Sequence, residues 1–125
     1  MTLNYKETRA MVCMAIAMAQ ADGTVEENEV KAVMVDLKGF GKSDEEAVEI
    51  IKEAGEMTPA EAVSLISNLG IEEKKYVCAF LAVVMAVDGD IADEELKMWR
   101  LISQVCGLPN TTVNDAVELW KSYNS

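Results

Sequence analysis

The chain has 125 residues, a formal net charge of −11 and no histidine, and half of its residues are hydrophobic. This length suits a single soluble domain with a continuous core. A strongly negative surface repels phosphate backbones and anionic membranes, so nucleic acid is not an expected partner. Without histidine, a metal site would be built from carboxylate and carbonyl oxygens, which favours the hard cations Ca²⁺ and Mg²⁺.

The first apolar segment, 11–19, has some features of a secretory signal, because basic residues precede it and "AQA" follows it. Glu7 interrupts the basic residues, and a similar apolar segment returns at 77–85. Cleavage after Ala21 would remove one of two matching segments. We therefore expect an uncleaved helix over about 5–20 in a cytoplasmic protein. The second apolar segment is too short to span a bilayer, so direct membrane insertion is not expected.

The chain contains an internal repeat, because a shift of 66 residues (88 − 22) aligns it with itself. The identities gather at turn residues, and the hydrophobicity between them agrees, which is typical of a duplication. The expected copies are residues 5–54 and 72–123, related by an approximate two-fold axis. Asp22, Gly23, Glu29, Lys31 and Gly41 fall on Asp88, Gly89, Glu95, Lys97 and Gly107.

Each copy is expected to hold three helices, and a linking helix at 58–69 joins the copies. The first helix of each copy is apolar nearly all round, which is typical of a central helix. The second is amphipathic; in the second copy Leu96, Trp99, Ile102 and Cys106 form one stripe. The sequence thus predicts one all-α domain over 1–125, a compact bundle of about seven helices. Their expected ranges are 5–20, 25–38, 44–54, 58–69, 72–86, 91–105 and 113–123.

Several helix boundaries carry recognisable signals. "SDEE" at 43–46 and "TPAE" at 58–61 are capping boxes, and the second has proline at the first helical position. Thr24 and Asp90 are the expected N-caps after the two Asp-Gly pairs. Glycines are expected at helix ends, namely Gly41, Gly55, Gly70 and Gly107. The three cysteines, Cys13, Cys78 and Cys106, are expected to be buried free thiols.

The two Asp-Gly turns look like the second half of an EF-hand calcium loop. Aligning Gly23 or Gly89 with the invariant glycine places Met18 or Val84 at the first ligand position, which excludes an EF-hand proper. Two interpretations stay open. In the first, Glu29 and Glu95 are clasps that accept hydrogen bonds from their own loops, each contributing ~1–3 kcal/mol. In the second, a divalent cation, Ca²⁺ or Mg²⁺, is held by Asp22, Glu29, Asp88, Asp90 and Glu95.

Two apolar helices that end in "ADG" or "VDG", each followed by a β-branched residue and a glutamate, resemble the tellurite-resistance TerB-like family. "GLP" at 107–109 fits the same pattern, and the resemblance covers about 10–121. It implies an all-helical fold with a pseudo-two-fold axis and a non-enzymatic role in a bacterial stress response, with metal binding and protein complexes. The acidic motif positions correspond to Asp22, Glu29, Asp88 and Glu95.

The expected function is therefore that of a binding or scaffold domain with a protein partner and acidic turns that hold a divalent cation. The alternative is a protein-interaction module whose acidic turns are structural clasps only. Catalysis is not expected, because the chain has no histidine, no nucleophile motif and no glycine-rich phosphate loop.

Overall fold

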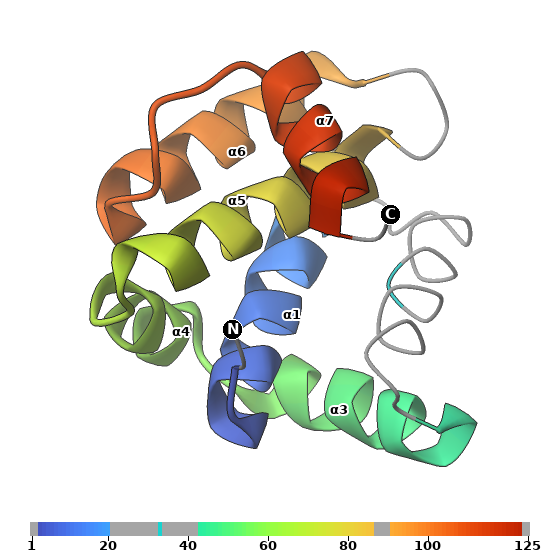
Figure 1. Cartoon of the computed structure of the whole chain (residues 1–125). Coiled ribbons are helices and arrows are strands. Elements are labelled where there is room, and N and C mark those ends of the chain that lie inside the picture. The colour runs from blue at the N-terminus through green and yellow to red at the C-terminus, as the bar shows by residue number, and fades with distance from the viewer. Residues whose placement is uncertain (1–2, 21–32, 34–42, 87–90, 124–125) are drawn as a thin grey trace.

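The computed structural model describes residues 3–20, 33, 43–86 and 91–123. The regular secondary structure of these residues is helical. These residues form six helices and no strand (Figure 1). The all-α prediction is confirmed. Six helices are described where about seven were expected, and the expected helix at 25–38 lies, apart from Val33, outside the described residues. The six are α1 (Tyr5–Ala19), α3 (Asp44–Glu56), α4 (Pro59–Ser67), α5 (Ile71–Ala86), α6 (Asp93–Cys106) and α7 (Val113–Tyr123).

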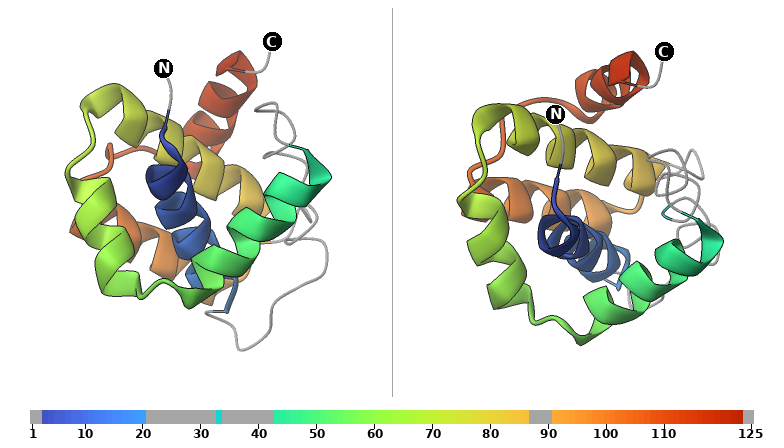
Figure 2. Two further views of the ribbon diagram at one scale, coloured as in Figure 1. Left: turned by 90° about the horizontal axis from the view of Figure 1, so that it is seen from below. Right: turned by 60° about the horizontal axis from the view of Figure 1, so that its bottom comes forward.

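Two helices, α1 and α5, pack against each other in the middle of the described bundle (Figures 1 and 2). Every side chain over 10–15 of α1 and over 76–82 of α5 is buried. A helix that is apolar on all sides needs neighbours on all sides, so the central position predicted from the sequence is confirmed. The core contains few aromatic side chains and relies on aliphatic and methionine packing, including Met11, Met18 and Met85.

The remaining helices cover this central pair. α3 and α4 pack on α1, α7 packs on α5, and α6 contacts α1, α4 and α5. The aromatic residues concentrate where α7 meets α5: Tyr76 lies 5.3 Å from Trp120 and 5.5 Å from Tyr123, measured between ring centroids. Phe80 meets Trp120 edge-on at 5.7 Å. Aromatic pairs at these separations add to the packing of α7 on α5.

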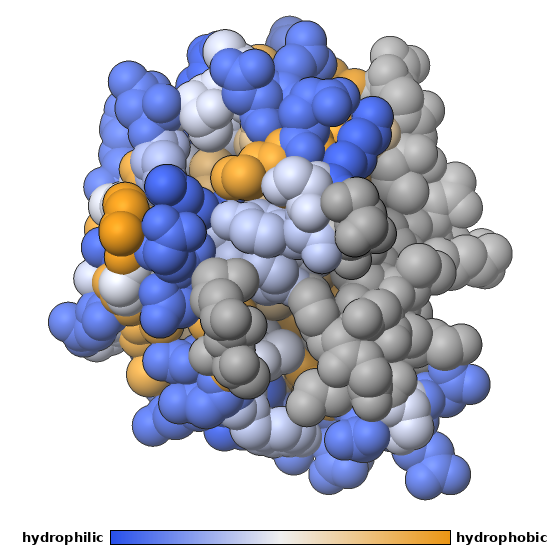
Figure 3. Space-filling view, in the orientation of Figure 1, coloured by the Kyte–Doolittle hydropathy of each residue, from blue (hydrophilic) through white to orange (hydrophobic). Residues whose placement is uncertain are grey.

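The outer surface of the described residues is mostly hydrophilic on the face shown in Figure 3, as the high charge of the chain requires. Orange, hydrophobic atoms reach this surface in small groups only. One group lies at the left edge, over the end of α6 and the start of α5. Exposed aliphatic side chains on these two helices are Ile71, Leu101 and Val105.

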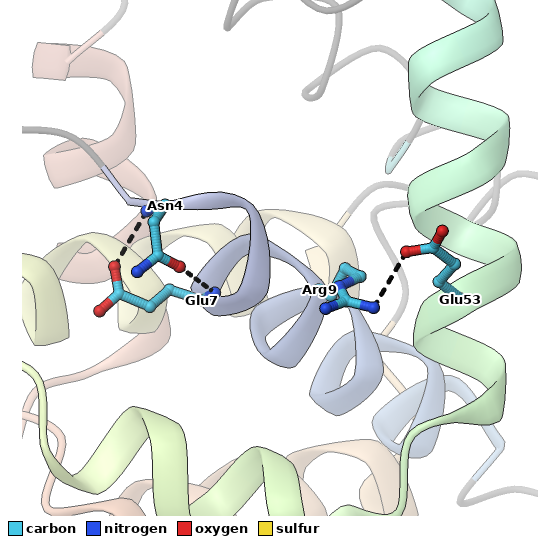
Figure 4. Close-up of polar contacts among 4 residues, drawn as sticks. All are labelled: Asn4, Glu7, Arg9 and Glu53. Carbon is cyan, nitrogen blue, oxygen red and sulfur yellow. Dashed lines mark hydrogen bonds and ion pairs between the residues drawn. The ribbon is translucent and has the colours of Figure 1, made fainter.

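Local capping signals determine the starts of three helices. The predicted capping boxes of α3 and α4 are both present: Ser43 and Thr58 accept hydrogen bonds from the backbone N–H groups of Glu46 and Glu61. The helix α1 has a third, in which Asn4 Oδ1 accepts from the Glu7 N–H at 2.7 Å (Figure 4). Each box satisfies backbone N–H groups that the first helical turn leaves without partners.

The start of α6 differs from the prediction. Ala92, rather than Asp90, is the N-cap residue, and its side chain makes no capping hydrogen bond. Ile91 is half-buried against the core, which holds the approaching backbone extended and delays the helix to Asp93. Tertiary packing has therefore outweighed the local capping preference, and the third helical residue is Glu95 instead of Asp93.

The glycines at the helix ends behave differently from one another. Gly107 ends α6 in the left-handed conformation, with φ 70° and ψ 33°. The Leu108 N–H donates to the Ser103 carbonyl at 2.8 Å and the Gly107 N–H to that of Gln104 at 3.4 Å, which is a Schellman motif. Gly55 was expected after the end of its helix, but it lies inside α3, which continues to Glu56.

An ion pair connects α1 to α3. Arg9 Nη1 lies 2.9 Å from Glu53 Oε2 (Figure 4). The guanidinium also stands 5.1 Å from the centre of the Tyr5 ring. Both charged side chains are partly exposed, so this pair contributes at most about 1 kcal/mol to the free energy of unfolding.

Candidate functional site

Of the five acidic residues predicted to hold a cation, the structure describes Glu95. The other four, Asp22, Glu29, Asp88 and Asp90, lie outside the described residues. Glu95 occupies the third position of α6 and is 5% exposed, which makes it the only buried charged side chain among the described residues. Burying a carboxylate is costly unless hydrogen bonds or a positive charge compensate it, so its place at the acidic turn needs a physical cause.

The start of α6 supplies part of that cause. The first N–H groups of a helix have no intrahelical acceptors, and Ala92 offers no side-chain oxygen. A carboxylate in the first turn is also favoured by the positive end of the helix dipole. Glu95 is not free, because it has an interaction partner. Its two oxygens have the chemistry of hydrogen-bond acceptors for N–H groups and of ligands for a hard cation.

The described carboxylates do not gather elsewhere into a metal centre. Among residues 3–20, 33, 43–86 and 91–123, no group of three Asp, Glu, Cys or His side chains could hold a metal ion. Glu95 is therefore the one described member of the predicted cation site. It is grouped with the other four acidic residues of that site on the basis of the sequence motif.

The three cysteines are all described, and all are buried and free, as predicted. Burial raises the pKa of each thiol, and that of Cys78 reaches about 11. The nearby Lys74 ammonium partly offsets this effect at Cys106. Since the thiolate is the reactive form, these thiols are poor nucleophiles and poor metal ligands near neutral pH.

Sequence reasoning missed a second feature, which lies on the outward side of α6. We call it the α6 surface: the exposed side chains of Lys97, Arg100, Leu101, Gln104 and Val105. Leu101 and Val105 lie one turn apart, and each is 52% exposed. The predicted apolar stripe of α6 is confirmed on the opposite side, where Trp99, Ile102 and Cys106 are buried, so these two aliphatic residues are additional to the core.

A pocket of about 400 Å³ adjoins the α6 surface, between α6 and the loop that follows it. The Schellman motif at Gly107 turns the chain back beside the helix and so forms one wall of this pocket. Five of its eight lining residues are polar, and Trp99, Leu108 and Pro109 are the apolar ones. The lining residues are Trp99, Arg100, Ser103, Gln104, Leu108, Pro109, Asn110 and Thr111.

The sequence did contain a signal for this second feature. Residues 96–112 include no Asp or Glu, although 22 of the 125 residues are acidic. Glu95 stands immediately before this acid-free segment, and Asp115 is the next acidic residue after it. A local reversal of charge in an acidic protein is typical of a surface with a specific counterpart.

No helix in the described part of the chain combines the length and apolar character that crossing a membrane requires. The described residues thus define a class: a compact all-α domain with a buried glutamate at a helix start and a cationic, partly apolar helix surface. No family model matches the chain, and no curated protein is similar to it.

A solved structure that is similar over nearly the whole chain gives the comparison. It is the crystal structure of a protein of unknown function from Porphyromonas gingivalis, with 38% sequence identity and a TM-score of 0.86. The match covers 97% of this chain and 92% of that one. The chain therefore belongs to the same family as the Porphyromonas gingivalis protein, and the two share the all-helical fold.

Proposed function

We propose that the chain is a non-enzymatic, TerB-like binding domain that acts as a scaffold in a bacterial stress response of the tellurite type. In this proposal its acidic turns hold a divalent cation, Ca²⁺ or Mg²⁺, through Asp22, Glu29, Asp88, Asp90 and Glu95. The observation that carries the proposal is the burial of Glu95, 5% exposed at the start of α6. A buried carboxylate needs compensating positive charge or hydrogen-bond donors, and a bound divalent cation would supply the positive charge.

The proposal includes the internal duplication. A shift of 66 residues along the sequence aligns α1 with α5, and a shift larger by three residues aligns α3 with α7. In support, α1 packs against α3 just as α5 packs against α7. A duplicated sequence of this kind has two corresponding acidic turns, and the proposal therefore assigns Glu29 the same role as Glu95.

Calorimetric titration of the whole chain with Ca²⁺ and with Mg²⁺ tests the cation site. The wild type is expected to give saturable heat, and the combined variant Glu29→Gln, Glu95→Gln is expected to give none. The matched control is Glu94→Gln, which removes an exposed charge from the same helical turn and should leave the heat unchanged. No saturable heat from the wild type would refute the cation site.

The second candidate function is a protein-interaction module whose glutamates are clasps without an ion. The observation that favours it is the missing side-chain cap at Ala92, which leaves N–H groups of α6 available to a returning carboxylate. In this case Glu95→Gln lowers the free energy of unfolding by about 1–3 kcal/mol, with and without divalent cation. If the cation is bound, the variant instead loses the extra stability that cation gives to the wild type, about 2.7 kcal/mol at a hundredfold excess over Kd.

A further inference from the structure

The α6 surface carries two positive charges that no ion pair among the described residues neutralises. Lys97 and Arg100 are exposed, and neither forms an ion pair within the described residues. Lys74 adds a third cation at the end of the helix, since its ammonium stands beside Gly107. In a chain of net charge −11, these cations and the acid-free segment 96–112 form a local positive region.

Apolar contact area lies between these charges. Leu101 and Val105 share one face of α6 at i, i+4 spacing, with Lys97 one turn before Leu101 and Arg100 immediately before it. An exposed Val48 on α3 provides a comparison, because it is 56% exposed but stands among Glu45, Glu49 and Lys52. The α6 surface therefore differs from an ordinary exposed aliphatic side chain in combining two such residues with unpaired cations.

The neighbouring pocket offers further donors to an anionic group. Arg100 and Gln104 belong both to the α6 surface and to the pocket wall, opposite Asn110 and Thr111 of the loop. Trp99 also lines the pocket.

We propose that the α6 surface and its pocket bind an acidic, amphipathic segment of a partner protein. Aliphatic side chains of the segment pack on Leu101 and Val105, while a carboxylate enters the pocket and pairs with Arg100. This inference rests on the proposed role as a protein-binding domain and names its partner's chemistry; it does not depend on the cation at the acidic turns.

The charge distribution favours an acidic peptide segment over a membrane or a nucleic acid as the ligand of the α6 surface. A membrane or a nucleic acid is an extended polyanion that would face the whole acidic surface and be repelled by it. A short segment contacts the positive region alone, and charges more than about 8 Å away are screened at physiological ionic strength. The aliphatic pair also suits a folded peptide better than a flexible phosphate chain.

The test uses the full chain, labelled with ¹⁵N, and a synthetic helical peptide of leucine and glutamate of about 14 residues, roughly four helical turns. The expected result is saturable chemical-shift changes at Lys97, Arg100, Leu101 and Val105 and in the loop at 108–111. A peptide with lysine in place of every glutamate should cause no chemical-shift changes at these positions. Raising the salt concentration should weaken the binding.

Variants then separate the surface from general charge and hydrophobicity. Arg100→Glu with Leu101→Ser should weaken peptide binding about tenfold or more, because it removes a charge pair and an apolar contact. The matched control, Val48→Ser with Lys52→Glu on α3, makes the same kinds of change and should leave the affinity within about twofold, a difference below 0.5 kcal/mol. Both variants keep the buried core, so folding can be checked by circular dichroism.

Three results would overturn the inference. One is the absence of shift changes with the acidic peptide, and another is equal weakening by both double variants. The third is a concentration-dependent dimer that Leu101→Ser dissociates, which would make a second copy of the chain the occupant. If the wild-type chain binds Ca²⁺ or Mg²⁺ in the calorimetric titration but does not bind the acidic peptide, this inference alone is refuted. If it binds the peptide but gives no saturable heat with either cation, the cation site alone is refuted.

Discussion

The left-handed end of α6 gives a stability prediction that the structure specifies in detail. Gly107 has φ 70° and ψ 33°, a conformation in which an L-residue costs about 1–2 kcal/mol. A Cβ there would lie 3.2 Å from Lys74 Nζ, the mobile end of a side chain that can move aside. The backbone term therefore dominates, and Gly107→Ala should lower the free energy of unfolding by about 1–2 kcal/mol.

Gly55→Ala is the matched comparison. Gly55 lies inside α3, and a Cβ at this position meets no atom within 4 Å. Alanine is favoured over glycine in a helix interior by about 0.5–1 kcal/mol, so this substitution should stabilise the chain. Urea denaturation followed by far-ultraviolet circular dichroism measures both variants. Melting temperatures should move in opposite directions, by roughly 3–5 °C per kcal/mol for a domain of this size.

Two results would refute this reasoning. If both alanines lower stability, then Gly55 is not in a regular helix interior. If Gly107→Ala is neutral, then the end of α6 does not require the left-handed conformation, and the Schellman motif that shapes the pocket is dispensable. A change in the urea dependence itself would instead indicate altered compactness of one state.

Three further predictions concern the core and the caps. Burial raises the pKa of Cys78 from 9.0 to about 11, so the folded chain keeps a proton that the unfolded chain loses. The protonated Cys78 thiol therefore contributes up to about 3 kcal/mol to the free energy of unfolding below pH 9, and this contribution decreases as the pH rises toward 11. In Cys78→Ala, the urea concentration at the unfolding midpoint should fall less with increasing pH over this alkaline range than it does in the wild type. Thr58→Ala removes the side-chain oxygen that caps α4 and should cost about 1 kcal/mol in the same assay, with Ser64→Ala on the exposed side of that helix near neutral. Trp120→Ala removes the aromatic contacts with Tyr76 and Phe80 and should cost about 3–5 kcal/mol; a loss below about 1 kcal/mol would mean that α7 does not depend on them.

Features that depend on a few adjacent residues were predictable from the sequence. The capping boxes at Ser43 and Thr58 involve side chains three residues apart, and both are present as predicted. The central helices could be identified because a segment that is apolar on every side has only one favourable place in a bundle. The left-handed end of α6 was likewise marked by Gly107.

Features that depend on tertiary packing were harder to predict. The start of α6 moved from Asp90 to Ala92 because Ile91 packs on the core, which no local pattern reveals. The burial of Glu95 is of the same kind, since its position in the acidic motif left both a clasp and a cation ligand open. For the α6 surface, the acid-free segment was visible, but the exposure of Leu101 and Val105 required the packing of the helix.

The most direct test of the proposed function is the number of divalent cations bound per chain, measured by equilibrium dialysis of the full chain against Ca²⁺ and Mg²⁺ with a fluorescent or radioactive tracer. The account predicts at least one specifically bound cation per chain, retained in Glu94→Gln and lost in the combined variant Glu29→Gln, Glu95→Gln. Binding that never saturates, or that falls equally in both variants, would show only general attraction to an acidic surface and would contradict the cation site.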